Sequence, residues 1–158
     1  MQQDFLNEKL FLILKTMNYQ EEIEFCIPDE ITKIPTDYFC NTKLEVLTNY
    51  EHISKIGKCS FENANLKEFR VPNGTTEIPD WCFSYCKLEI ITNYDHITKI
   101  GQYAFRGTNL KEFRVPNGVN EIPFGCFLNS KLEKIIIPRS IKNISNNAIP
   151  PKCLITWI

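Results

Sequence analysis

The side chains that could do chemistry in this chain of 158 residues are seven cysteines, two histidines and a scatter of carboxylates. Cys82 and Cys86 stand four residues apart, but no second pair and no nearby histidine completes a zinc site. Motifs for phosphate binding, an activated serine, a zinc protease and a calcium loop are missing from the sequence. We therefore expect free thiols in a reducing compartment, no cofactor, and a protein that is not an enzyme.

The charge and hydropathy of the sequence limit the classes of binding partner and the cellular location that we expect. The chain has 18 basic and 19 acidic side chains, and so a formal net charge of −1. Binding to nucleic acid or to a membrane surface needs clustered excess positive charge, so we expect neither. The longest apolar run, at residues 10–14, is much shorter than a membrane span or a signal-peptide core. These features predict a cytoplasmic protein without membrane insertion.

Internal repeats dominate the sequence. The string LKEFRVPNG occurs at residues 66–74 and again at 110–118, and four apolar columns recur at half that spacing, every 22 residues. The columns are Ile34, Ile56, Ile78, Ile100, Ile122 and Ile144; Phe39, Phe61, Phe83, Phe105, Phe127 and Ile149; Leu44, Leu66, Leu88, Leu110, Leu132 and Leu154; and Phe25, Leu47, Phe69, Ile91, Phe113, Ile135 and Trp157. Residues 27–158 therefore divide into six repeats of 22 residues, predicted to form one solenoid domain.

The repeats alternate between two kinds, which explains a second period of 44 residues. The residue after the column isoleucine is proline in one kind and Gly57, Gly101 or Ser145 in the other. The two histidines, His52 and His96, share one column two repeats apart. Strands that far apart in a sheet are separated by roughly 10 Å, too far for the histidines to share a metal. We expect both in surface turns.

Each repeat predicts a short strand, a turn and one turn of helix. In the strand at residues 66–71, apolar side chains point inward, and Glu68 and Arg70 point outward. Pro72 and the Asn-Gly pair after it form the turn, and Pro79 begins a single helical turn. Because one unit cannot bury its own apolar face, neighbours must stack into a solenoid with a parallel sheet along one side. The fold class is therefore an α/β repeat.

The first 26 residues precede the repeats and contain a predicted helix. Asp4 can cap this helix over residues 4–18, and an apolar stripe follows near helical spacing (Phe5, Leu6, Leu10, Ile13, Leu14, Met17). We expect residues 1–26 to supply an N-terminal capping helix that covers the open end of the first repeat. An amphipathic helix that binds a membrane or a partner is the alternative, although Lys9 and Lys15 are few for a membrane-binding face.

The repeat pattern is similar to that of a known family. Residues 110–127 follow L-x-x-F-x-V-P-x-x-V-x-x-I-x-x-x-A-F, with Cys126 in the alanine position, and this pattern resembles the BspA-type (treponemal-type) leucine-rich repeats. The resemblance covers about residues 25–158. It implies a curved, right-handed leucine-rich-repeat solenoid with its parallel β-sheet on the concave side, commonly used for adhesion or protein interaction in bacteria and protists. The asparagine- and isoleucine-rich composition fits an AT-rich genome, such as that of an amoeboid protist.

The C-terminal strand has no predicted cap. Its apolar edge would expose unpaired backbone groups and an open core layer. We expect a two-fold homo-oligomer through this uncapped repeat, with contacts made by Leu154, Ile155, Trp157 and Ile158. A terminus that folds back over its own edge is the alternative.

The outward face of the sheet is the predicted partner-binding surface. It mixes charges, aliphatic side chains and tyrosines, as interfaces do, and its candidate binding residues are Glu68, Arg70, Ile90, Glu112, Arg114, Tyr50 and Tyr94. Alternating Glu and Arg could also merely keep the sheet soluble. The predicted function is a scaffold or adaptor that binds another protein on the concave sheet. The alternatives are a BspA-like adhesin exported without a classical signal, and a purely structural self-assembling protein.

Overall fold

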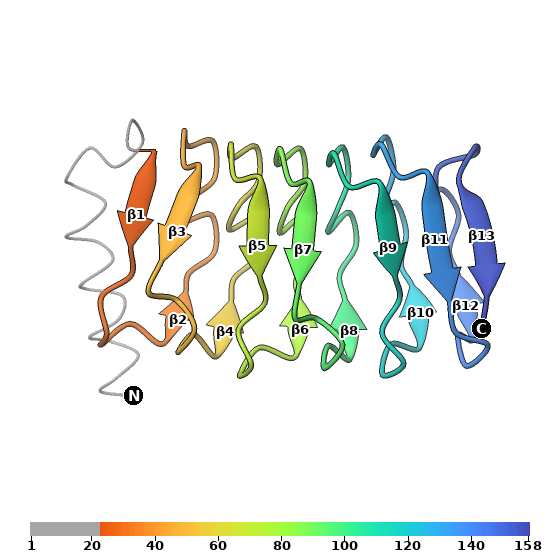
Figure 1. The fold of residues 1–158 in the computed structure, drawn as a ribbon, viewed down its shortest axis with the longest axis horizontal. Coiled ribbons are helices and arrows are strands. Elements are labelled where there is room, and N and C mark those ends of the chain that lie inside the picture. Colours follow the sequence, from red (N-terminus) through yellow and green to blue (C-terminus); the bar gives the residue numbers. More distant parts are fainter. Residues whose placement is uncertain (1–22) are drawn as a thin grey trace.

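The computed structural model describes residues 23–158, which wind into a solenoid with two ladders of parallel strands (Figure 1). The predicted capping helix at residues 4–18 lies outside the described residues. One ladder contains the longer strands β1 (Glu24–Cys26), β3 (Val46–Thr48), β5 (Glu68–Arg70), β7 (Ile90–Thr92), β9 (Glu112–Arg114), β11 (Lys134–Ile137) and β13 (Leu154–Trp157). The other contains the two-residue strands β2 (Lys33–Ile34), β4 (Lys55–Ile56), β6 (Glu77–Ile78), β8 (Lys99–Ile100), β10 (Glu121–Ile122) and β12 (Asn143–Ile144).

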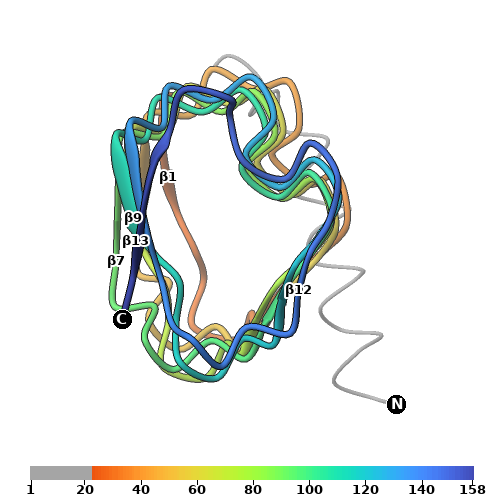
Figure 2. The ribbon, with the colours of Figure 1, turned by 90° about the vertical axis from the view of Figure 1, so that its right-hand side faces the viewer.

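The outer surface of the longer strands is called here the strand face. Seen along the solenoid axis, the coils largely overlie one another, so the axis curves little over the described part (Figure 2). In β5, β7 and β9 the middle side chain is buried and its two neighbours are exposed. The alternation predicted for Glu68 and Arg70 is therefore confirmed.

A continuous stack of phenylalanine rings runs through the core. Consecutive rings of the phenylalanine column, Phe39 to Phe127, lie 5.3–5.8 Å apart and within 9° of parallel. Phe69 and Phe113 tilt against this stack from the longer strands. All of these rings are at most 3% exposed. Each coil thus covers the apolar face of the next one, which is what a repeat needs in order to fold.

The predicted single-turn helices are wrong, because the described residues contain no helix. After the short strand, the N–H groups of Trp81, Phe83 and Tyr85 donate to carbonyl oxygens of the next coil, and those of the residues between them donate three residues back. Trp81 and Tyr85 have φ of 60° and 55°, values that a right-handed helix excludes. The segment is therefore a stack of turns that contributes a third set of contacts between coils.

The longer strands are grouped in blocks, which gives the 44-residue period its structural meaning. Hydrogen bonds join β1 to β3, β5 to β7, and β9 to β11 to β13, but not β3 to β5 or β7 to β9. Wider gaps separate these blocks in Figure 1. Each strand that is bonded to its successor ends at, or just before, an Ile-Pro or Val-Pro dipeptide. The two strands that are not bonded to their successor are followed by Asn49-Tyr50 and Asn93-Tyr94. The dipeptide after a strand therefore accounts for every gap.

The Asn-Tyr dipeptide ends a strand by changing its backbone direction. Asn49 has a φ of 53°, and its Nδ2 donates to the Ile27 carbonyl of the preceding coil at 2.7 Å. Tyr50 then turns inward and its ring stacks on Phe69, with centroids 5.2 Å apart. The Tyr50 hydroxyl oxygen accepts the Arg70 N–H at 3.1 Å. The Tyr50 hydroxyl thus replaces a backbone carbonyl of the sheet as the acceptor for the Arg70 N–H, which would otherwise be unpaired.

The last coil departs from the 22-residue register. Lys134 pairs with Leu154 and Ile135 with Ile155, an offset of 20 residues, whereas β9 and β11 pair at an offset of 22. Pro151 explains the change, since its column holds residues with positive φ in the preceding coils (Asn41, Asn63, Tyr85, Gly107, Asn129) and proline cannot adopt that conformation. The predicted columns of Leu154 and Trp157 are therefore wrong: Ile155 takes the inward position of Ile135, and Leu154 points outward.

Candidate interaction site on the strand face

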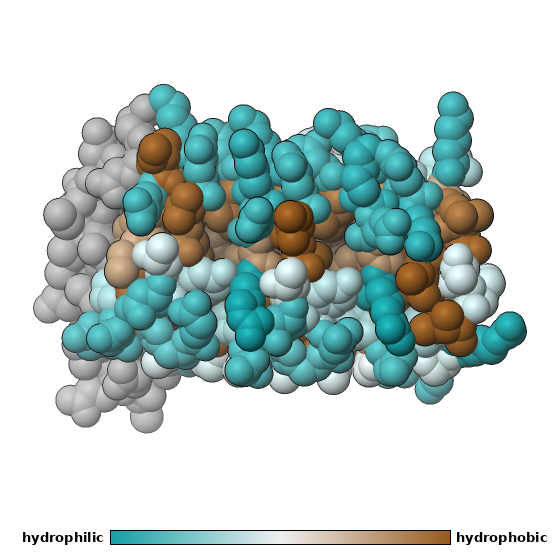
Figure 3. Space-filling view, in the orientation of Figure 1, coloured by the Kyte–Doolittle hydropathy of each residue, from teal (hydrophilic) through white to brown (hydrophobic). Residues whose placement is uncertain are grey.

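The candidate binding residues on the strand face fall into two groups by exposure. Glu68, Arg70, Glu112 and Arg114 are exposed, and Ile90 is 48% exposed. Val46 is also an exposed aliphatic side chain, at 47%. In Figure 3, brown apolar side chains form an interrupted band along the middle of this face, with hydrophilic side chains above and below it. This arrangement of an apolar strip and a polar margin is typical of interfaces.

The gap between β3 and β5 produces a groove of about 430 Å³ on this face. Val46 and Leu47 line it from β3, Glu68 and Arg70 from β5, and Ile90 closes it on the β7 side. The register places Ile90 directly beside Glu68. The structure therefore brings an exposed acid, an exposed base and two exposed aliphatic side chains together around one hollow.

The two tyrosines among the candidates lie mostly beneath the surface. Tyr50 is only 9% exposed, and Tyr94 is partly buried, with its ring 4.9 Å from that of Phe113. Burial raises the pKa of both phenols above the ordinary value of 10.0. Both hydroxyl groups accept a backbone N–H of the next coil. These tyrosines support the groove and offer little surface to a partner.

We predict that Tyr50→Phe destabilises the fold by about 1–2 kcal/mol, because it leaves the Arg70 N–H without its acceptor in a partly buried gap. Urea denaturation followed by circular dichroism measures the change. Tyr94→Phe is the matched control: its hydroxyl lies 3.4 Å from the Arg114 nitrogen and should matter less. Equal stabilities of the wild type and Tyr50→Phe would contradict the structural role of this hydroxyl.

Two charged side chains at the groove have no ion-pair partner among residues 23–158. Neither Glu68 nor Arg70 forms an ion pair with another residue of the described part. Glu112, two coils along, lies 3.4 Å from Lys134 on the adjacent strand. Both partners of that pair are exposed to solvent, so the pair contributes little to stability. Glu68 and Arg70 are therefore available to charges on another molecule.

The predicted self-association residues lie at the far end of the solenoid. Leu154, Ile155, Trp157 and Ile158 are 42–63% exposed, although three of them belong to the hydrogen-bonded strand β13. The strand does not fold back over its own edge: it continues the parallel ladder beside β11. These four side chains leave this end of the described solenoid largely apolar.

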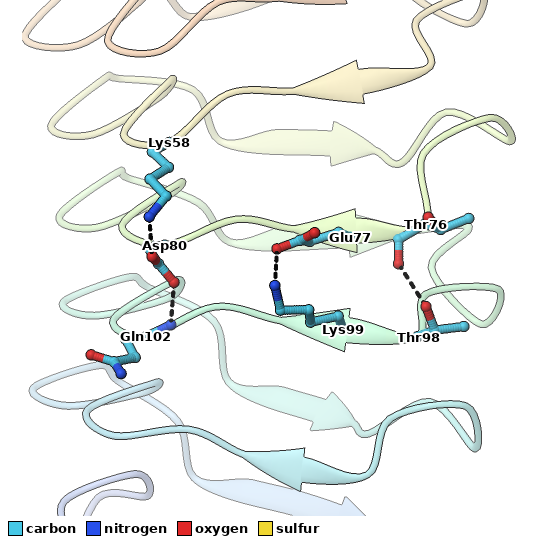
Figure 4. A network of polar contacts seen from close by, with 7 residues as sticks. All are labelled: Lys58, Thr76, Glu77, Asp80, Thr98, Lys99 and Gln102. Carbon is cyan, nitrogen blue, oxygen red and sulfur yellow. Dashed lines mark hydrogen bonds and ion pairs between the residues drawn. The ribbon is translucent and has the colours of Figure 1, made fainter.

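On the side of the two-residue strands, polar contacts link neighbouring coils (Figure 4). The Lys58 Nζ lies 2.7 Å from an Asp80 carboxylate oxygen, and the other Asp80 oxygen accepts the Gln102 N–H. Lys99 pairs with Glu77 at 2.8 Å. The hydrogen bond from Lys58 is the main cause that lowers the pKa of Asp80. These contacts across successive coils suit this surface to holding the coils together.

An aromatic cluster on the stacked turns was not predicted from the sequence. Trp81 and Tyr103 stack with centroids 4.1 Å apart, and the Arg106 guanidinium lies 4.9–5.6 Å from the rings of Trp81, Tyr85 and Tyr103. All three aromatic residues have positive φ. The signal that could have revealed the cluster is that these columns hold Asp, Cys, Asn or Gly in the other coils, apart from Pro151 in the last.

The seven cysteines are all free, and Cys82, Cys86 and Cys126 are buried. Burial raises the pKa of Cys86 to about 12 and that of Cys126 even further. Burial is also the main cause that raises the pKa of Cys59 to about 12. Among the described residues, no group of three potential ligands could hold a metal. Cys82, Cys86 and Cys126 therefore behave as small core side chains.

We predict that a thiol reagent at pH 8 labels the native protein rapidly at Cys26, the exposed cysteine, and leaves Cys82, Cys86 and Cys126 unlabelled until the chain is unfolded. Peptide mapping by mass spectrometry after timed labelling identifies the modified residues. Labelling of the same sample in urea provides the control for intrinsic reactivity. Rapid labelling of Cys126 in the native protein would contradict its burial.

We also predict that stability falls as pH rises above about 9. A thiol in the unfolded chain ionises near 9.0, whereas Cys86 in the fold stays protonated to about 12, so alkaline conditions favour the unfolded state. The stabilising effect is present below pH 9 and is lost between 9 and 12. Urea midpoints measured from pH 7 to pH 10 under reducing conditions test this. Cys126→Ala, which copies Ala104 and Ala148 of the same column, should reduce the slope.

Comparison with protein families gives a match over most of the chain. Six copies of the BspA type leucine-rich repeat region cover residues 32–152. Comparison with curated proteins finds no match. No helix in the described residues could span a membrane.

Two crystal structures show the same fold. A leucine-rich repeat protein from Eubacterium ventriosum is 26% identical, with a TM-score of 0.61 over 82% of this chain. Another from Bacteroides ovatus is 20% identical, with a TM-score of 0.63 over 85% of this chain. The match spans 32% of the first protein and 45% of the second, so this chain corresponds to less than half of either. With six repeat copies matched and the solenoid shared, the chain belongs to the BspA-type leucine-rich repeat family.

Proposed function

We propose that the chain is a protein-interaction scaffold or adaptor whose strand face binds another protein. The observation that carries the proposal is the groove between β3 and β5, where exposed Val46 and Ile90 flank a glutamate and an arginine that have no ion-pair partner within the described part. Membership of a repeat family that generally provides interaction surfaces is consistent with it. Arg70 and Arg114 are the proposed charged contacts, and Ile90 is the apolar anchor.

A pull-down from the organism's lysate tests this proposal. The wild type is compared with Arg70→Glu/Arg114→Glu, and captured proteins are purified and titrated against both. A partner retained by the wild type and lost by the variant supports the proposal. Lys55→Glu/Lys142→Glu is the matched control, since it changes the net charge equally at exposed positions away from the strand face. Equal capture by all three proteins would contradict the role of the strand face.

The exposed end beyond β11 is a second proposed contact surface. Leu154, Ile155, Trp157 and Ile158 would be covered by a second copy of the chain, because apolar side chains and an open strand edge both gain from pairing. Deletion of residues 154–158 should then convert an oligomer into a monomer of lower solubility. An unchanged mass in light scattering would contradict this contact.

We place the proposed adaptor in the cytoplasm, where seven free thiols are compatible with the reducing conditions. An adhesin at the cell surface is the competing proposal for a member of this family. Labelling of intact cells with a reagent that does not cross membranes separates the two. Labelling only after lysis supports the adaptor, and labelling of intact cells supports the adhesin.

A further inference from the structure

The strand face carries two parallel rows of outward side chains that run along the solenoid. The first row holds Glu24, Val46, Glu68, Ile90, Glu112 and Lys134, and the second holds Cys26, Thr48, Arg70, Thr92, Arg114 and Ile136. Each acid in the middle of the first row therefore has an arginine two residues later in the second row. Both members of each couple are exposed on the same strand, and no ion pair joins Glu68 to Arg70.

This pattern is self-complementary under one particular rotation. A two-fold axis that lies parallel to the solenoid axis, between two facing strand faces, reverses the strand direction but keeps the order of the coils. The first row of one copy then faces the second row of the other. Glu68 faces Arg70 of the other copy and Glu112 faces Arg114, and each contact occurs twice because the interface is isologous. Val46 and Ile90 face the methyl groups of Thr48 and Thr92.

The other two-fold arrangement of facing strand faces is unfavourable. An axis parallel to the strands reverses the order of the coils and places each row against itself. Centred on Ile90, it sets Glu68 against Glu112 and Arg70 against Arg114, and like charges in contact oppose association. The charges thus favour the first arrangement, because only there does each of these glutamates face an arginine. They also favour one register, since sliding by one coil sets Glu68 against Thr92.

We propose that the occupant of the strand face is a second copy of this chain, in the parallel, in-register arrangement with the two-fold axis along the solenoid. The inference rests on the proposed function, because it names a partner for the same surface. Seven strands about 4.8 Å apart and three residues long give on the order of 400 Å² per copy, below the roughly 800 Å² typical of tight complexes. The dimer is therefore weak, dependent on salt and concentration, and separate from the contact proposed for β13.

Sedimentation velocity of the full chain at low salt, from tens to hundreds of micromolar, tests the proposal. The wild type should dimerise and dissociate as salt is added. Arg70→Glu/Arg114→Glu and Glu68→Arg/Glu112→Arg should each weaken self-association by about tenfold or more, because like charges then face each other. Mixing these two variants should restore a dimer. The variant that carries all four substitutions should dimerise like the wild type, at unchanged net charge.

The four-substitution variant separates this proposal from binding of a different protein. A foreign partner presents a fixed charge pattern and loses contact when the four charges are exchanged, whereas a second copy exchanges its charges as well. A wild type that stays monomeric overturns the inference. So does a four-substitution variant that self-associates no more strongly than the two variants with two substitutions each. If a captured protein is nevertheless lost from Arg70→Glu/Arg114→Glu, the proposed function stands. Circular dichroism of each variant verifies folding.

Discussion

Phe83→Ala should destabilise the protein by about 3–5 kcal/mol, because it removes a fully buried ring and leaves a cavity that the stacked coils cannot close. The Phe83 ring lies 5.4 Å from that of Phe61 and 5.8 Å from that of Phe105, and Phe69 tilts against it at 5.1 Å. The substitution therefore interrupts the aromatic stack in the middle of the solenoid. Urea denaturation monitored by circular dichroism measures the loss.

The position of Phe83 also affects the shape of the transition. In a solenoid each coil contacts mainly its neighbours, so a break in the middle weakens the coupling between the two halves. We expect a broader transition as well as a lower midpoint. Phe124→Ala is the matched control, because Phe124 is 37% exposed and contacts Tyr103 by its edge; its cost should stay below about 1 kcal/mol. A similar loss for both variants would contradict the importance of the stack.

Gly101→Ala should also be strongly destabilising, by about 2–3 kcal/mol or more, because the new methyl group would overlap the backbone of the preceding coil. A Cβ at Gly101 would lie 2.3 Å from the Asp80 nitrogen and 2.5 Å from the Pro79 carbonyl carbon. The backbone must move to admit it, and the hydrogen bond from the Gly101 N–H to the Ile78 carbonyl would be strained. Thermal and urea denaturation measure the effect.

Gly74→Ala provides the control for Gly101→Ala. A Cβ at Gly74 would meet its nearest neighbour, the Ser54 Cα, at 3.3 Å, and Gly74 is exposed in a turn. We expect a change within about 0.5 kcal/mol. If Gly101→Ala were as harmless as this, the close approach of successive coils at that column would be disproved.

The periodic core could be predicted because it depends on one simple requirement, namely that each coil bury the same positions. The inward placement of Ile78, Phe83 and Phe113 follows directly from spacing, and all three are at most 3% exposed. The single-turn helices were wrong for a physical reason. Spacing shows that residues 79–86 turn back toward the core, but not whether their N–H groups bond within the coil or to the next one.

The grouping of the longer strands into blocks and the register shift of β13 depend on single residues, and the repeat period alone does not show their effect. Asn-Tyr after β3 and β7 was visible in the sequence, but its effect on pairing depends on the positive φ of the asparagine and on the path of the tyrosine ring. Pro151 likewise falls on a column whose need for positive φ became known only from the structure. Columns of equal spacing therefore concealed a last coil that is two residues short.

For the candidate site, the outward direction of the charged side chains could be predicted from the sequence. The positions of the aromatic side chains could not. Glu68 and Arg70 are exposed as expected, and strand alternation is sufficient to place them. The tyrosines were assigned to the surface, yet Tyr50 is buried because the gap between blocks admits its ring. The aromatic cluster around Arg106 was missed because its residues come from two successive coils and meet only when those coils stack.

The grouping of strands into blocks limits how such an array can lengthen by duplication. Copying a 44-residue pair, which contains one repeat of each kind, keeps each kind of repeat next to the other kind. It therefore adds one complete block of hydrogen-bonded strands. Copying an Asn-Tyr repeat alone would produce two successive strands that are not hydrogen-bonded to the strand after them. The second of these strands would then have no hydrogen-bonded neighbour on either side. Copying a repeat that continues with Val-Pro only widens a block, as the three strands β9, β11 and β13 illustrate. Duplication of whole pairs is thus favoured, and the identical segments at residues 66–74 and 110–118 fit such a duplication.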